Sequence, residues 1–222
     1  MSKLKLPVFL ILIILLMDQA LKIWVKTNML IGEQIPIFGN WGFIHFTENN
    51  GMAFGWEIGG EIGKLTLSIF RILAVAGIGW YLAQLAKKDA PKGLLISFSM
   101  IFAGAVGNII DSAFYGLVFS DSYRQVAEFM PEAGGYSSFL HGRVVDMFYF
   151  PIIKTTIPAN LQFWASDPHP IPFTFFRPVF NIADSSIFLG TVTILIFHRK
   201  FFKQEQEEQS NGQENVEQAE TI

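Results

Sequence analysis

Three aspartates, Asp111, Asp146 and Asp184, lie in or beside apolar segments of this chain, where a carboxylate is costly and is usually functional. Two carboxylates held close together cannot both ionise, so they share one proton at intermediate pH. One can then act as a base on a water molecule, while the other, protonated, donates to a carbonyl oxygen. These residue types therefore allow hydrolysis by a pair of aspartates, provided that the fold brings two of them together.

Other interpretations of the same residues stay open at this point. Asn181 can cap a helix that begins at residue 182, and Asp184, three residues later, fits the acidic member of a capping box. A proton-coupled transporter also places carboxylates at membrane depth, although its helices are typically broken by Gly or Pro near the midplane. A polar cluster that only supports the fold would use the same residues.

Further polar residues accompany the aspartates. Asp18 and Lys22 are four residues apart, so on a helix they share a face and are predicted to form a structural ion pair. Asn49, Asn108 and Asn181 are candidates for contacts near the aspartates. Each of these asparagines could instead be a helix cap or a turn residue.

The composition indicates an integral membrane protein. Of 222 residues, 51% are hydrophobic and the mean hydropathy is +0.37. The absence of cysteine excludes disulfides, thiolate metal sites and a cysteine nucleophile. Four scattered histidines do not predict a metal site, and no charge pattern indicates binding to nucleic acid. We expect neither a metal nor an organic cofactor.

Four apolar segments are each close to the roughly 20 residues that a membrane helix needs. Lysines and arginines precede the first segment, separate the second from the third and follow the fourth, so the positive-inside rule places both termini in the cytoplasm. The first segment lacks a small-x-small cleavage site and is predicted to stay uncleaved. The four segments are Leu6–Val25, Leu65–Ala86, Gly93–Phe119 and Ile182–His198.

The predicted fold class is membrane all-α with a small β addition. Residues 1–200 would form one four-helix membrane domain with outer loops 26–64 and 120–181. In the first loop, the runs Ile35–Phe38 and Phe43–Thr47 predict a small periplasmic sheet. The second loop is rich in Pro and aromatics, which fits packing at the lipid interface or a small folded insert. Residues 201–222, with six glutamates and one lysine, predict a disordered acidic cytoplasmic tail.

Five motifs, taken together and in order, resemble the bacterial lipoprotein signal peptidases (signal peptidase II). Each motif alone is weak, but the five in this order over residues 15–190 are specific. They are MDQALK with Asp18 and Lys22, NNGMAF with Asn49 and Gly51, GNIID with Asn108 and Asp111, GRVVDMF with Asp146, and FNIADSSI with Asn181 and Asp184.

The resemblance implies an aspartic endopeptidase of the bacterial cytoplasmic (inner) membrane, with its active site facing the periplasm or cell exterior. Its substrate would be a diacylglyceryl-modified prolipoprotein, cut N-terminal to the lipid-modified cysteine, and lipid would be its other partner. Asp146 and Asp184 would be the catalytic pair and would activate a water. We expect the protein to be a monomer.

The resemblance also implies supporting roles around this pair. Asn49 and Gly51 would lie on the outer sheet that closes over the substrate, although Gly51 could simply permit a tight turn. Asn108 and Asn181 would bind the peptide backbone or orient the aspartates, and Asp111 would support the site.

The sequence departs from the family pattern in three places. Ser112 stands where the family usually has arginine after the GNxxD aspartate, and Arg143, Arg124 or Arg177 could supply the missing charge. The segment between Asp111 and Asp146 is longer than usual, and a second insertion separates Asp146 from Asp184. These inserts could form a lid, bind a partner or merely decorate the fold, and they interrupt no motif.

Overall fold

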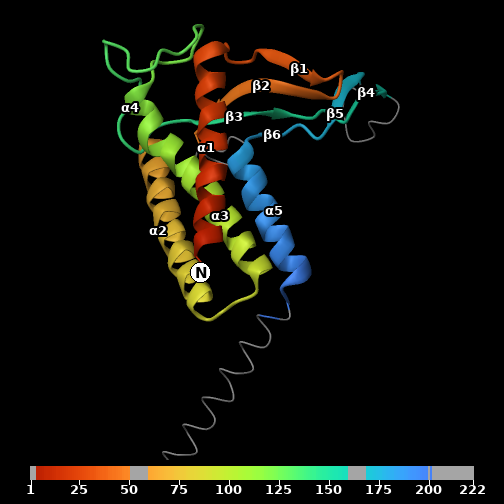
Figure 1. Cartoon of the computed structure of the whole chain (residues 1–222). Helices are drawn as coiled ribbons and strands as arrows, with labels where there is room; N and C mark the ends of the chain where they lie inside the picture. Colours follow the sequence, from red (N-terminus) through yellow and green to blue (C-terminus); the bar gives the residue numbers. More distant parts are fainter. Residues whose placement is uncertain (1–3, 51–59, 160–168, 200, 202–222) are drawn as a thin grey trace, which may run out of the picture.

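Helices form one end of the molecule and small sheets the other (Figure 1). The structure is a computed structural model that describes residues 4–50, 60–159, 169–199 and 201. Gly51 and nearly all of the predicted acidic tail, 201–222, therefore lie outside the described residues.

Each of the four predicted apolar segments contains a helix. Three helical stretches are long and apolar enough to cross a membrane, namely Lys5–Asn28, Ile62–Lys87 and Lys92–Val118, whereas the fourth, Ile182–Phe197, is apolar but shorter. The elements are α1 (Lys5–Asn28), α2 (Gly60–Lys87), α3 (Lys92–Ile110), the π-helical turn η2 (Asp111–Tyr115), α4 (Gly116–Val118) and α5 (Ile182–Phe197).

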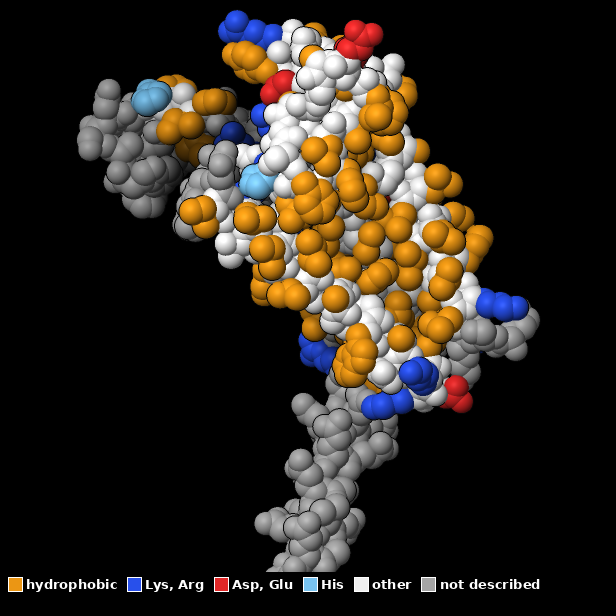
Figure 2. All heavy atoms as spheres, turned by 90° about the vertical axis from the view of Figure 1, so that its left-hand side faces the viewer, with side chains coloured by type: hydrophobic (Ala, Val, Ile, Leu, Met, Phe, Trp, Pro, Cys, Tyr) orange, Lys and Arg blue, Asp and Glu red, His pale blue; other side chains and the backbone are white. Residues whose placement is uncertain are grey.

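The helices present large apolar side chains on their outer faces. Figure 2 shows a nearly continuous apolar surface on the α2 side of the molecule, with lysine or arginine side chains near the upper and lower ends. On α2 the exposed residues include Phe70, Leu73 and Trp80. A soluble protein rarely exposes a contiguous apolar surface of this extent, so lipid is its natural neighbour.

Small residues bring α3 and α5 into close contact. A Cβ atom added to Gly190 would lie 2.6 Å from the backbone oxygen of Ser97, and one added to Gly107 would lie 3.3 Å from Cβ of Ala183. A Cβ atom added to Gly104 would overlap the carbonyl oxygen of Ala183. Small residues at helix contacts allow this approach in membranes, where van der Waals packing drives association. The packing sets the depth at which the start of α5 meets α3.

We expect Gly104→Ala to destabilise the fold by about 1–3 kcal/mol, because the added methyl group must push α5 away from α3. Thermal unfolding in detergent would measure the loss. Gly77→Ala on α2 is the matched control, since nothing lies within 4 Å of its added Cβ and it gains the same helix propensity. Equal unfolding temperatures for the two variants would contradict the packing argument.

A four-stranded antiparallel sheet covers the end of the helices at which α5 begins (Figure 1). Its order is β1 (Gln34–Phe38), β2 (Gly42–Asn49), β3 (Val144–Tyr149) and β6 (Val179–Phe180), while β4 (Ile153–Ile157) and β5 (Ile171–Phe175) form a second, two-stranded sheet. The two β runs predicted in the first loop are confirmed. The second loop was predicted to pack at the lipid interface or to form a small folded insert, without strands being assigned, and it contributes the remaining four strands.

The sheet is fixed to the C-terminal end of α1 by an apolar core. Val25 of α1 and Met29, which follows it, pack with Phe46 of β2 and with Val145 and Met147 of β3, and all five side chains are almost fully buried. Alternation along β3 then directs the side chain of Asp146 to the opposite face of the strand. In this way the core determines where Asp146 points.

Candidate functional site

Asp184 is held in the first turn of α5. The side chain of Asn181 accepts a hydrogen bond from the Asp184 backbone N–H at 2.8 Å, and the Asp184 carboxylate accepts from the Asn181 backbone N–H at 3.4 Å. These reciprocal bonds make the capping box that the sequence suggested. The cap holds the carboxylate still, so a structural role and a chemical role are compatible in one residue.

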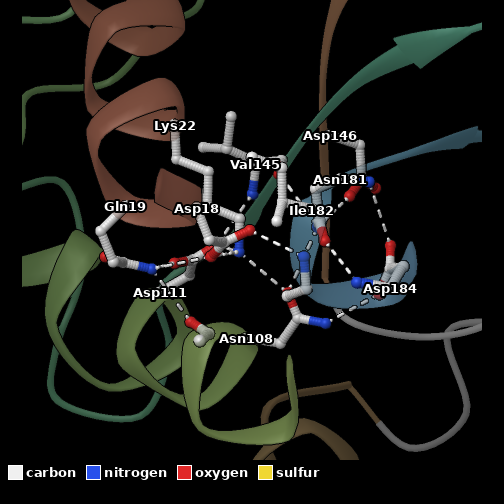
Figure 3. Close-up of polar contacts among 12 residues, drawn as sticks. Asp18, Gln19, Lys22, Asn108, Asp111, Val145, Asp146, Asn181, Ile182 and Asp184 are labelled. Carbon is white, nitrogen blue, oxygen red and sulfur yellow. Dashed lines mark hydrogen bonds and ion pairs between the residues drawn. The ribbon is translucent and has the colours of Figure 1, made fainter. Parts of the chain in front are cut away.

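Asp146 reaches toward Asp184 from β3 (Figure 3). It is 4% exposed, Nδ2 of Asn181 donates to its Oδ1 at 2.7 Å, and Nδ2 of Asn49 donates to its Oδ2. The pKa of Asp146 is raised to about 8, mainly because the side chain is buried and also because the charge of Asp184 lies nearby. At neutral pH Asp146 therefore carries a proton.

Asn108 connects Asp184 to a charged cluster on α1. Its Nδ2 donates to Oδ1 of Asp184 at 2.8 Å, and its Oδ1 accepts from Nζ of Lys22 at 2.9 Å and from Asn181 at 3.2 Å. The Asn108 amide is thus fixed from both sides, which determines that its NH₂ group faces Asp184.

Lys22 is the centre of that cluster and is fully buried. Its ammonium group lies 2.9 Å from Oδ2 of Asp18 and 2.8 Å from Oδ2 of Asp111, in addition to its bond with Asn108. The predicted Asp18–Lys22 ion pair is confirmed, and Asp111 joins it. Three acceptors match the three donors of the ammonium group, so its buried charge is satisfied.

Asp111 is committed to these supporting contacts. Its Oδ1 accepts from Nε2 of Gln19 at 2.9 Å and its Oδ2 from the backbone N–H of Val145 at 3.3 Å. It opens the π-helical turn, a feature that is common at functional sites. Asp18 has a matching task, since its Oδ1 accepts from the Ala183 backbone N–H at 2.9 Å. The Lys22 cluster therefore joins α1, α3, β3 and α5 directly behind Asp146 and Asp184.

Arg143 lies apart from this cluster. It pairs with Glu48 and Asp121, whereas the cation that contacts Asp111 is Lys22. Arg143 was a candidate for the missing positive charge beside Ser112, but its guanidinium is paired with these two carboxylates instead. The hydroxyl of Ser112 donates to the Asn108 backbone oxygen at 3.1 Å.

Sequence reasoning overlooked two residues near the site. Gln19, quoted in the first motif without a role, donates to Asp111 and accepts from the Tyr115 hydroxyl at 3.2 Å. Arg71, on α2, has a guanidinium whose charge interacts with that of Asp184. An arginine inside an apolar span was the available signal, because such residues are rare and face the protein interior.

The arrangement presents one buried, protonated carboxyl group and one carboxylate that accepts hydrogen bonds from amides. Such a pair can deliver a proton to a carbonyl oxygen while taking one from water. Within the described ranges, no three His, Asp or Glu side chains are grouped so that they could hold a metal ion.

Known proteins resemble this chain over most of its length. Residues 10–200 match the family described as "Signal peptidase (SPase) II". A "Lipoprotein signal peptidase" of Porphyromonas gingivalis is 48% identical over 188 residues, which cover 84% of this chain and 80% of the relative. One from Amoebophilus asiaticus is 35% identical over 196 residues, 87% of this chain and 77% of the relative.

A solved structure shares the fold. It is described as a "Bacterial membrane enzyme structure by the in meso method at 2.3 A resolution", and it superposes with a TM-score of 0.54 at 24% identity. The match covers 87% of each chain.

Proposed function

This chain belongs to the signal peptidase II family, and from that premise we propose that it is an aspartic endopeptidase acting on diacylglyceryl-modified prolipoproteins. It cuts N-terminal to the lipid-modified cysteine, and Asp146 and Asp184 are its catalytic pair. One observation carries the assignment of the pair. The Asn181 side chain donates to the Asp146 carboxyl group and the Asn181 backbone N–H donates to that of Asp184, whereas the neighbouring Asp18 and Asp111 are both paired with Lys22.

The pair hydrolyses the peptide bond through water. Asp184 takes a proton from the water as its oxygen attacks the carbonyl carbon, and Asp146 gives its proton to the carbonyl oxygen. The tetrahedral intermediate then collapses and the C–N bond breaks. Asp184 passes its proton to the leaving nitrogen, and Asp146 recovers a proton from the hydroxyl group. The pair returns to its starting state with one proton shared.

Asn49, Asn108 and Asn181 position these two carboxyl groups. The Asn108 amide and the Asn181 backbone N–H donate to the Asp184 carboxyl group, while the amides of Asn49 and Asn181 donate to that of Asp146. Such contacts fix the reacting groups before substrate arrives, which contributes to the rate without any rearrangement at the moment of reaction.

The proposed placement puts four helices across the cytoplasmic membrane, with both termini in the cytoplasm. Lysines at the cytoplasmic ends support this orientation, including Lys87 and Lys92 between α2 and α3. The sheet and the two aspartates then face the periplasm or exterior. A signal peptide is itself an apolar helix, so its cleavage bond would reach the aspartates where helix gives way to extended chain, and water would arrive from outside.

Cleavage of a purified prolipoprotein over a pH series tests this function. We expect the enzyme in detergent to shift the gel mobility of the diacylglyceryl-modified substrate and to leave the unmodified one intact. Since Asp146 must be protonated, the rate should fall above about pH 8, approaching tenfold per pH unit. Tryptophan fluorescence at each pH would show that the fold persists. A rate that stays level to pH 10 would exclude Asp146 as the acid.

A further inference from the structure

A second buried charge cluster lies where β2 ends, outside the proposed pair. Glu48 is its centre, with a side chain that is only 2% exposed. Its Oε1 contacts the buried Nζ of Lys26 and accepts from the Ser122 hydroxyl at 2.9 Å, while its Oε2 accepts from Arg143 at 3.1 Å. Donors from α1, the insert and the start of β3 therefore fix this carboxylate on both oxygens.

Tyrosine and a second ion pair complete the cluster. The Tyr136 ring lies under Nζ of Lys26 and the guanidinium of Arg143, at 5.0 and 4.9 Å from its centroid. Arg143 also contacts Asp121 at 3.3 Å. Ser122, Asp121 and Tyr136 all belong to the insert that separates Asp111 from Asp146. The insert thus supplies three of the groups that hold Glu48 and its partners.

Glu48 is adjacent in sequence to a residue of the proposed active site. Asn49, the next residue and the last of β2, donates to Oδ2 of Asp146. In the β2–β3 ladder Glu48 is opposite Val145 and Asn49 is opposite Val144, just after an irregularity in register between Ile44 and Thr47. The ladder resumes at the end of β2, where Glu48 and Asn49 occupy opposite faces of the strand.

We propose that Glu48 is a positioning residue that acts through Asn49, and that the insert serves to hold Glu48 in place. The charged cluster anchors one side of the strand, so that the Asn49 amide on the other side meets Asp146. This inference rests on the proposed function of the Asp146–Asp184 pair.

The direction in which Glu48→Gln shifts the pKa of Asp146 distinguishes a positioning role of Glu48 from a purely electrostatic one. Burial and the Asp184 charge raise the pKa of Asp146, whereas the Lys22 charge and the Asn49 and Asn181 amides lower it. If Glu48→Gln displaces Asn49, the pKa of Asp146 rises and activity extends to higher pH. If only the charge of Glu48 mattered, its removal would lower that pKa.

The test compares Glu48→Gln with Glu33→Gln, an exposed glutamate in the same outer loop. We expect Glu48→Gln to reduce kcat about tenfold with KM unchanged, and to move the alkaline limb upward by about half a pH unit. Asn49→Ala should move the limb in the same direction, and the double variant should add little. Ser122→Ala, which removes one donor and no charge, should give a smaller shift of the same sign.

A second measurement does not depend on turnover. The infrared carboxyl band of protonated Asp146, obtained by difference against Asp146→Asn, can be titrated in wild type and in Glu48→Gln. A titration of this band that moves to higher pH in Glu48→Gln supports the positioning role of Glu48. It does so even if the wild type leaves the prolipoprotein uncut, and in that case only the proposed function fails. An unchanged or lowered titration, beside a wild type that cleaves, overturns the role of Glu48.

Discussion

Replacement of Asp184 by asparagine is expected to lower the rate of prolipoprotein cleavage by about a thousandfold or more, with the fold retained. Asparagine cannot take a proton from water, but it keeps the shape of the side chain and can still accept from the Asn181 backbone at the start of α5. Asp146→Asn should have an equal effect, because it removes the proton that the carbonyl oxygen receives. Initial rates in detergent, with thermal unfolding alongside, would measure both.

Asp89→Asn is the matched control for these variants. Asp89 is exposed in the turn between α2 and α3 and has a φ of 59°, a conformation that asparagine accepts readily. The Asp89→Asn variant should cleave prolipoprotein at the wild-type rate. The opposite pattern, in which Asp111→Asn abolishes cleavage and Asp146→Asn is tolerated, would move the catalytic pair to Asp111 and Asp184.

Replacement of Lys22 by methionine is expected to destabilise the protein by roughly 3–5 kcal/mol, because it leaves Asp18 and Asp111 buried without their cation. The loss should be visible as a lower thermal unfolding temperature in detergent. Activity should fall as well, since Asn108 loses one of the two donors that orient it toward Asp184.

Two further variants test whether the loss of stability in Lys22→Met comes from the buried ion cluster. Lys87→Met removes an exposed lysine from the end of α2 and should leave stability unchanged within about 0.5 kcal/mol. Adding Asp18→Asn to Lys22→Met should restore part of the stability, because it removes one of the two buried carboxylates that lack a cation. The amide oxygen of the new asparagine can still accept from the Ala183 backbone N–H. If Lys22→Met proves as stable as Lys87→Met, the ion cluster does not support the fold.

The local parts of this architecture could be predicted from the sequence. Apolar runs located the four helices, and a four-residue spacing paired Asp18 with Lys22. The Asn181–Asp184 capping box was readable because both partners lie within one helical turn. Each of these features depends on residues that are close together in the chain.

The contacts that assemble the site could not be predicted in the same way. Asp111 meets Lys22 across 89 positions of sequence, and Asn49 meets Asp146 across 97. β3 was missed because Val144–Met147 are buried on both faces, so the run lacks the alternation that identifies a half-buried strand. Arg143 looked available as a replacement charge only because the burial of Glu48 is invisible in sequence.

The capping box limits which residues could replace Asp184 in a relative that has lost its activity. Asp184 supplies one of the two reciprocal bonds of the capping box of α5, so alanine at this position removes a capping hydrogen bond together with a proposed reacting group. A descendant that abandoned proteolysis would still be under selection to fold. Such a pseudoenzyme should carry asparagine or serine here rather than an apolar residue. An alanine scan would also report misfolding and lost chemistry as a single defect at position 184.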